Sequence, residues 1–231
     1  MKNNIIEITD LEKTFESKGE SLTVLKDLSL TIEAGTKNAI IGQSGNGKST
    51  LLNIISGIET FTSGTVKVGD YTLGKMSEKD LCNYRSSFIG LVFQFHYLLK
   101  DFSALENIFL PAYMAGKSKK ESMDKAEQLL NDVGLYERKN HLPSELSGGE
   151  RQRIAVARSL INNPELILAD EPTGNLDPEN AAVISDLLYS VSDKYNKTLL
   201  VVTHDNDVAK KAENIFRLVN RKITLVEDVK S

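Results

Sequence analysis

Residues 42–49 read Gly-Gln-Ser-Gly-Asn-Gly-Lys-Ser, and this glycine-rich segment constrains the fold more than any other part of the chain. It fits the pattern G-x-x-x-x-G-K-[ST] of a phosphate-binding loop. The apolar run 39–41 precedes it and the mostly apolar run 50–55 follows it, which predicts a strand, the loop, and a helix beginning near Lys48. Glycines allow the tight turn that points backbone N–H groups at one anion, and the helix start adds the positive end of its dipole.

The loop side chains have specific expected roles. Lys48 is expected to reach the β- and γ-phosphates of a nucleoside triphosphate, and the Ser49 hydroxyl to ligate the Mg²⁺ that bridges them. The loop residues expected to bind the nucleotide are Gly42, Gln43, Ser44, Gly45, Asn46, Gly47, Lys48, Ser49 and Thr50. By itself, the loop predicts only that a nucleoside triphosphate binds.

Charge and hydropathy exclude several classes of partner. The 231-residue chain has a formal net charge of −4, whereas nucleic-acid binding needs a surplus of Lys and Arg, so we expect no nucleic-acid partner. No apolar run reaches the roughly 18 residues of a membrane helix, and the first residues lack the profile of a secretory signal. Any membrane role is therefore expected to come through a partner. The single cysteine, Cys82, cannot form an internal disulfide, which favours a reducing compartment.

Short apolar or alternating runs, separated by turns, predict two sheets and an α/β fold. The first is a small antiparallel N-terminal sheet, with expected strands at residues 5–9, 28–32, 65–68 and 71–73. The second is a central, mainly parallel sheet, because its runs are short, apolar and followed by polar or glycine residues. Its expected strands are residues 39–41, 88–93, 166–169 and 199–203.

The pattern becomes helical between the strand that ends at Phe93 and the run that begins at Leu166. Ser118-Lys119-Lys120-Glu121 fits a capping box, and an apolar stripe follows it until Gly134. A second helix is expected from about Glu150 and stops before Pro164. We therefore expect one domain over residues 1–231, with a core at 1–93 and 163–231 and an inserted helical subdomain at about 94–162.

Two adjacent carboxylates end a buried strand in the run Leu166-Ile167-Leu168-Ala169-Asp170-Glu171. Ligands of α/β sheets bind at the carboxyl ends of strands. Asp170 is therefore expected to hold the Mg²⁺ shell, and Glu171 to orient and deprotonate an attacking water. In isolation, such a pair would more often cap the next segment. The phosphate loop in the same chain makes catalysis the better interpretation.

The run Leu146-Ser147-Gly148-Gly149-Glu150 resembles the LSGGQ signature of ABC-type ATPases, with Glu150 in place of the glutamine. This resemblance covers essentially the whole chain. It implies the ABC-type P-loop NTPase fold, bound ATP and Mg²⁺, and hydrolysis of ATP to ADP and phosphate. It also implies that two chains pack head to tail in the ATP-bound state. Ser147, Gly148, Gly149 and Glu150 of one chain then cover the nucleotide on the phosphate loop of the other.

Further residues match motifs of the same family. The resemblance places Gln94 at the Q-loop, where it would reach the metal or the water, and His204 at the switch histidine, where it would contact the γ-phosphate. Asp177 matches the D-loop at the dimer seam, and its position before Pro178 also fits a helix N-cap. Phe15 aligns with the aromatic residue that stacks on adenine; an ordinary core role remains the alternative.

Within the family, the chain is most similar to the ATP-binding subunits of lipoprotein-releasing transporters. The strings that carry this similarity are residues 93–99, 102–107, 140–145 and 162–164. The family has a groove that accepts a short helix of a membrane subunit, which implies docking of permease subunits between Phe95 and Phe102. The alternative for these side chains is packing between the two lobes.

The resemblance implies a peripheral protein on the cytoplasmic face of the inner membrane. The wider group includes macrolide- or peptide-exporter ATPases and cell-division ATPases that regulate a cell-wall enzyme without transport, and both stay open as alternatives. A chromosome- or repair-associated ATPase is not expected, because Gln94 and Leu146 are too close for a long inserted coiled coil.

Overall fold

The structure, a computed structural model, describes residues 3–17 and 19–226. The outer ends of the expected domain, at residues 1–2 and 227–231, lie outside the described residues. The chain divides into two compact units, of which the first combines Met1–Arg85 with Lys197–Ser231 and the second is Ser86–Asn196. The segment expected to be helical, residues 94–162, falls inside the second unit, together with strands and a helix that flank it.

The expected N-terminal antiparallel sheet is present in the first unit. Its strand order is β2-β1-β4-β5, and every pairing in it is antiparallel. The strands are β1 (Asn4–Ser17), β2 (Glu20–Glu33), β4 (Ser63–Val68) and β5 (Tyr71–Thr72). β1 and β2 extend beyond the expected runs because bulges interrupt the alternation of apolar side chains without ending the pairing.

Parallel strands of the first unit place the phosphate loop. β3 (Lys37–Ile41) pairs in parallel with β8 (Thr198–Thr203) and with β9 (Asn214–Val219), and β10 (Lys222–Leu225) is antiparallel to β9. Helix α1 (Lys48–Ile55) follows the loop and buries Leu51, Leu52, Ile54 and Ile55. The strand-loop-helix order expected for residues 39–55 is thus confirmed, whereas β9 and β10 were not expected.

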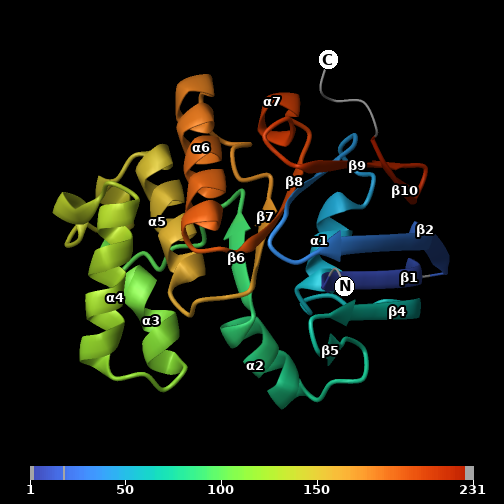
Figure 1. The fold of residues 1–231 in the computed structure, drawn as a ribbon, viewed down its shortest axis with the longest axis horizontal. Helices are drawn as coiled ribbons and strands as arrows, with labels where there is room; N and C mark the ends of the chain where they lie inside the picture. The colour runs from blue at the N-terminus through green and yellow to red at the C-terminus, as the bar shows by residue number, and fades with distance from the viewer. Residues whose placement is uncertain (1–2, 18, 227–231) are drawn as a thin grey trace. The chain divides into compact units, whose positions relative to one another are not determined.

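The second unit contains another parallel pair, β6 (Ile89–Phe93) and β7 (Leu166–Asp170), which matches the expected strands. Helix α2 (Glu78–Ser87) leads into it across the boundary of the two units. Figure 1 shows the green-to-orange helices of this unit, in which α5 contacts α3, α4 and α6. These helices are α3 (Ala104–Met114), α4 (Lys119–Asp132), α5 (Gly148–Leu160) and α6 (Pro178–Lys194), with short 3-10 helices η1 (Tyr136–Arg138) and η2 (Pro143–Glu145).

Local caps decide where these helices begin. The Ser118 hydroxyl accepts the Glu121 N–H at 3.2 Å, as expected for α4. α5 begins at Gly148, close to the expected start at about Glu150, because Ser147 caps it and Glu150 completes a capping box. α3 was not expected, although Ser103 and Glu106 form the same motif at its start.

Candidate active site

The phosphate loop of the first unit has the backbone geometry that its glycines require. Gly45 and Gly47 have φ angles of 83° and 91°, in the left-handed region, and Gly47 is the N-cap of α1. A Cβ at Gly47 would also lie 2.7 Å from Val24 in β2. The loop is therefore specified both by its backbone conformation and by the strand behind it.

Lys48 closes the phosphate loop in this structure. Its side chain is only 5% exposed, and its Nζ donates to the carbonyl oxygens of Gly42 at 2.8 Å and Gln43 at 3.2 Å. By contrast, Gln43, Ser44 and Ser49 are exposed. The ammonium group is thus held against the loop backbone, next to residues that face solvent and could contact an anion.

Strand β9 packs against Gly42, the first residue of the phosphate loop. A Cβ at Gly42 would lie 2.6 Å from the Leu218 carbonyl oxygen, so no larger residue fits there without displacing the backbone. The Asn46 Nδ2 donates to the same oxygen at 3.2 Å. β9, which the sequence did not reveal as a strand, therefore supports the loop directly.

His204 and the phosphate loop follow the carboxyl ends of two neighbouring parallel strands, β8 and β3. In the parallel pair, Ile41 lies opposite Thr203, so Gly42 and His204 leave adjacent strands at the same end. The Thr203 Oγ1 accepts the Asp205 N–H at 3.0 Å, and Asp205 caps the short helix α7 (Asn206–Ala209). This arrangement holds the exposed His204 at the carboxyl end of β8.

Phe15 lies in β1 and is 39% exposed, so it is not an ordinary core aromatic. The Lys13 Nζ lies 4.4 Å from its ring centroid and pairs with the Glu59 carboxylate at 2.8 Å. One face of the ring therefore carries a cation, and stacking on adenine would use the other face.

The two carboxylates of the second unit lie at the end of β7. Asp170 pairs in register with Phe93, and Glu171 begins a turn in which its carbonyl oxygen accepts the Gly174 N–H at 3.0 Å. Glu171 has a φ of 44°, which is unfavourable for a residue with a side chain. Such strain persists only where the surroundings fix the backbone, and it concentrates at functional sites.

Gln94 lies beside this turn in the same unit. Its Nε2 donates to the Asn175 Oδ1 at 3.1 Å, and a Cβ at Gly174 would be 2.8 Å from that Nε2. The structure thus brings the Q-loop residue and the segment after Glu171 together.

The signature residues form the start of α5. The Ser147 hydroxyl accepts the Glu150 N–H at 3.2 Å, and the Glu150 carboxylate accepts the Ser147 N–H at 2.8 Å. A Cβ at Gly149 would lie 2.5 Å from the Asn180 side chain, and Asn180 in turn donates to the Asp177 carboxylate at 2.7 Å. Asp177 caps α6, which confirms the N-cap role expected for this residue. The signature and the D-loop are therefore neighbours within one unit.

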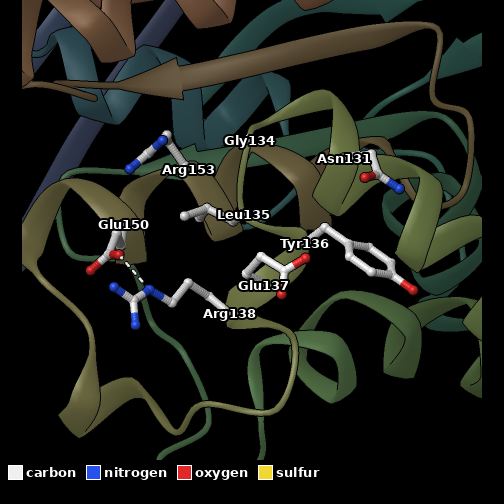
Figure 2. Close-up of a pocket in the computed structure, with 8 residues that line it drawn as sticks. All are labelled: Asn131, Gly134, Leu135, Tyr136, Glu137, Arg138, Glu150 and Arg153. Atoms are coloured by element: carbon white, nitrogen blue, oxygen red, sulfur yellow. Dashed lines mark hydrogen bonds and ion pairs between the residues drawn. The ribbon is translucent and has the colours of Figure 1, made fainter.

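A pocket of about 390 Å³ opens beside the signature helix. Figure 2 shows Arg138 and Glu150 pointing toward each other across it, with Arg153 on the same side as Glu150. The Arg138 Nε lies 3.2 Å from the Glu150 Oε1. The hydrogen bond from the Ser147 backbone, and secondarily Arg138, lower the pKa of the Glu150 carboxyl. Glu150, at the position of the family's glutamine, is thus an anion fixed at the helix start.

An exposed apolar surface follows Gln94. Phe95 is 61% and Tyr97 66% exposed, and Leu99 and Phe102 are also exposed. A half-buried arginine holds the backbone of this segment: Arg158 donates to the carbonyl oxygens of His96 and Tyr97 at 2.7 and 2.8 Å. These side chains do not form a packed core within their unit, so the surface could receive a partner.

The described residues contain no cluster of three or more His, Cys, Asp or Glu side chains that could hold a metal by themselves. In the same described part of the chain, no helix has the length and hydropathy that a bilayer crossing requires.

Sequence reasoning missed three polar residues that organise this region. Gln152 and Arg158 donate to the carbonyl oxygens of Phe93 and His96, on either side of Gln94. Asn107 donates to the Phe102 carbonyl oxygen, at the end of the exposed apolar surface. Gln152 stands in the string that follows the signature, but nothing in its local pattern distinguishes it from a surface polar residue.

The chain is similar to known ABC proteins over nearly its whole length. Residues 25–174 match the family model described as ABC transporter. The "Lipoprotein-releasing system ATP-binding protein LolD" of Treponema denticola is 58% identical over 94% of this chain and 96% of its own length. The protein of the same name from Treponema pallidum is 50% identical over the same shares.

Solved structures agree with these relatives. A dimeric ATP-binding cassette in a post-hydrolysis state, bound to ADP and Pi, matches with a TM-score of 0.88 and 36% identity over 98% of this chain and 99% of that chain. The expected fold class is thereby confirmed: a P-loop ATPase of the ABC type, with an antiparallel N-terminal sheet and a helical insertion.

Proposed function

This chain belongs to the ABC transporter family and is an ATPase of that class, and on that premise we propose that it drives a transporter that releases lipoproteins from the inner membrane. One observation carries the proposal: the chain has two separate helix starts suited to phosphate, one after Gly47 and one after Ser147. One ATP cannot occupy both starts, so a second copy is needed. We propose lipoprotein as the substrate because the two Treponema relatives are named as parts of lipoprotein-releasing systems.

We assign nucleotide binding and hydrolysis to the residues of the phosphate loop and of the motifs that follow it in the chain. Lys48 binds the β- and γ-phosphates, and the loop N–H groups surround them. Ser49, Asp170 and Gln94 would hold Mg²⁺, which would neutralise phosphate charge. Glu171 takes the proton of the attacking water. His204 donates to the γ-phosphate, and Phe15 stacks on the adenine through the ring face opposite Lys13.

The composite site requires two chains. We propose that Ser147, Gly148, Gly149 and Glu150 of one chain, with Asp177 at the seam, contact the ATP bound by the other. The capping geometry supports this role, because a Ser147 hydroxyl that accepts the Glu150 N–H still has its own proton to donate. The dimeric relative supports the same assembly.

Membrane subunits would dock on the apolar surface between Phe95 and Phe102. The exposure of Phe95 and Tyr97, together with the Arg158 bonds to the His96 and Tyr97 carbonyl oxygens, supports a preformed contact surface. A chain docked in this way would lie on the cytoplasmic face of the inner membrane without entering it. In this proposal residues 94–162 form the helical subdomain between core segments 1–93 and 163–231.

Reconstitution tests the proposal. This chain and the membrane proteins that co-purify with it would be reconstituted in liposomes that contain a triacylated protein. The ATP-dependent transfer of the triacylated protein to a soluble acceptor would then be measured. We expect transfer that stops when ATP is replaced by a non-hydrolysable analogue. Stimulation by a macrolide without lipoprotein transfer, or activation of a cell-wall hydrolase without any transport, would overturn the assignment in favour of those related functions.

A further inference from the structure

We propose that Gln152 is a positioning residue for ATP hydrolysis, because its side-chain amide ties the backbone next to Gln94 to the backbone next to Glu171. The inference rests on the proposed function, since it concerns the hydrolysis step assigned there to Glu171.

The contacts of Gln152 are specific and enclosed. The residue lies in the second turn of α5 and is 1% exposed. Its Nε2 donates to the Phe93 carbonyl oxygen at 3.0 Å and to the Pro172 carbonyl oxygen at 2.8 Å. Phe93 immediately precedes Gln94, and Pro172 immediately follows Glu171. One amide group therefore sets the separation of the two segments on which the proposed water-handling residues stand.

The orientation of the amide follows from its partners. Both are carbonyl oxygens, which only accept, so the NH₂ group must face them and both of its protons are used. The Gln152 Oε1 is buried and has no hydrogen-bond partner within the described part of the chain. Burying an unpartnered oxygen is unfavourable, and a methionine of similar length would fill the space without it. Packing alone therefore does not explain a glutamine here, whereas two donors aimed at two strand ends do.

The Pro172 contact supports a strained part of the backbone. Glu171 has a left-handed φ of 44°, and the turn that contains it is closed by the Gly174 N–H on the Glu171 carbonyl oxygen at 3.0 Å. A non-glycine residue keeps such a conformation only when its neighbours over-determine it. The bond from Gln152 to the very next carbonyl is one of those determinants, so its loss lets the Glu171 carboxylate move.

Gln152 also connects this geometry to the signature, because it belongs to the same helix as Ser147. A displacement of α5 when the partner chain's nucleotide engages Ser147 would reach Phe93 and Pro172 through one rigid helix. Closure of the dimer and alignment of Glu171 are then linked mechanically.

Two substitutions of Gln152 test the proposal. Q152M keeps the length but removes both donors, and we expect kcat to fall about 10- to 100-fold, the scale of a small misplacement of a catalytic group. Nucleotide affinity should change less than about twofold. Q152E places a buried carboxyl between two carbonyl oxygens, which disfavours its ionised form. When protonated it donates to one of them, so its kcat relative to the parent should rise as pH falls, whereas Q152M should stay low at every pH.

The control is Q128E, an exposed glutamine of α4 changed in the same way, which should keep the parental kcat and pH profile. Nucleotide affinity and thermal unfolding are measured for each variant, so that loss of fold is separated from loss of turnover. Parental kcat in Q152M, or a Q152E profile parallel to the parent's, would overturn the positioning role. Failure of the proposed function looks different: the parent itself would not hydrolyse ATP, or E171Q would turn over at the parental rate.

Discussion

Gln94 and Asn175 hold each other through two hydrogen bonds. The Gln94 Nε2 donates to the Asn175 Oδ1 at 3.1 Å, and the Asn175 Nδ2 donates to the Gln94 carbonyl oxygen at 3.3 Å. The pair joins the segment after β6 to the turn that follows Glu171. Gln94 is therefore held in place through both its side chain and its backbone.

Replacing Asn175 with Ala should release Gln94. Each neutral hydrogen bond contributes about 1 kcal/mol, so the loss of both should lower kcat roughly fivefold to 30-fold if the interactions matter in the transition state. Steady-state ATPase assays measure the effect. N131A, which removes an exposed amide of α4, is the control and should keep the parental rate. An unchanged kcat in N175A would mean that Asn175 does not position Gln94.

Replacing Lys48 with Ala should abolish nucleotide binding or turnover. The substitution removes the ammonium group and both of its bonds to the loop carbonyls. Calorimetric titration with ATP and Mg²⁺ checks binding. K37A serves as control, because it removes a lysine of β3 that pairs with Glu213 outside the loop. Turnover equal to the parent's would place the nucleotide site elsewhere.

Replacing Glu171 with Gln should preserve ATP binding and lower hydrolysis about 10²- to 10⁴-fold, the usual contribution of a general base. ATP would then remain bound, and the dimer should accumulate in size-exclusion chromatography with ATP. The double variant K48A/E171Q should stay monomeric because it cannot bind nucleotide. An E171Q protein that remains monomeric with saturating ATP would contradict the composite site.

Replacing Glu150 with Gln should reduce stability only where Glu150 is ionised. Its folded pKa is lowered, first by the Ser147 backbone hydrogen bond, so its contribution is complete above the unfolded value of about 4.3 and is lost as pH falls through the lower folded value. The free energy of unfolding should differ by at most about 1 kcal/mol at pH 7, because the pair with Arg138 is partly exposed.

Urea unfolding of the parent and E150Q at neutral and acidic pH measures this difference. It should shrink as pH falls through and below about 4. A double-mutant cycle with R138Q isolates the ion pair from the cap. A difference that grows on acidification would contradict the assigned cause.

The contiguous motifs were readable from the sequence because their chemistry is local. The phosphate loop needs glycines at fixed offsets between a strand and a helix, and Gly45 and Gly47 have the left-handed angles that this requires. Ser118 caps α4 for the same reason. The Ser103 and Glu106 capping box at the start of α3 is an equally local signal.

The sequence patterns of α2, β9 and β10 are too weak to predict these elements. α2 buries only Tyr84 among its own residues, so it has no apolar stripe to detect. β9 and β10 are short and partly exposed, and their alternation is broken by charged residues. Secondary structure is predicted from the periodicity of apolar residues on a buried face, and these segments bury few residues.

The family, the phosphate loop, and the acidic and signature residues can be identified from the amino-acid sequence, because each is encoded within a few consecutive positions. The three-dimensional arrangement was needed to find that Gln152 bonds to Phe93 and Pro172, that Asn175 holds Gln94, and that Lys13 covers one face of Phe15. Gln152 and Asn175 reach partners far away in the chain, and the direction of each side chain depends on how helices and strands pack. A single sequence specifies which groups exist, whereas packing decides which of them meet.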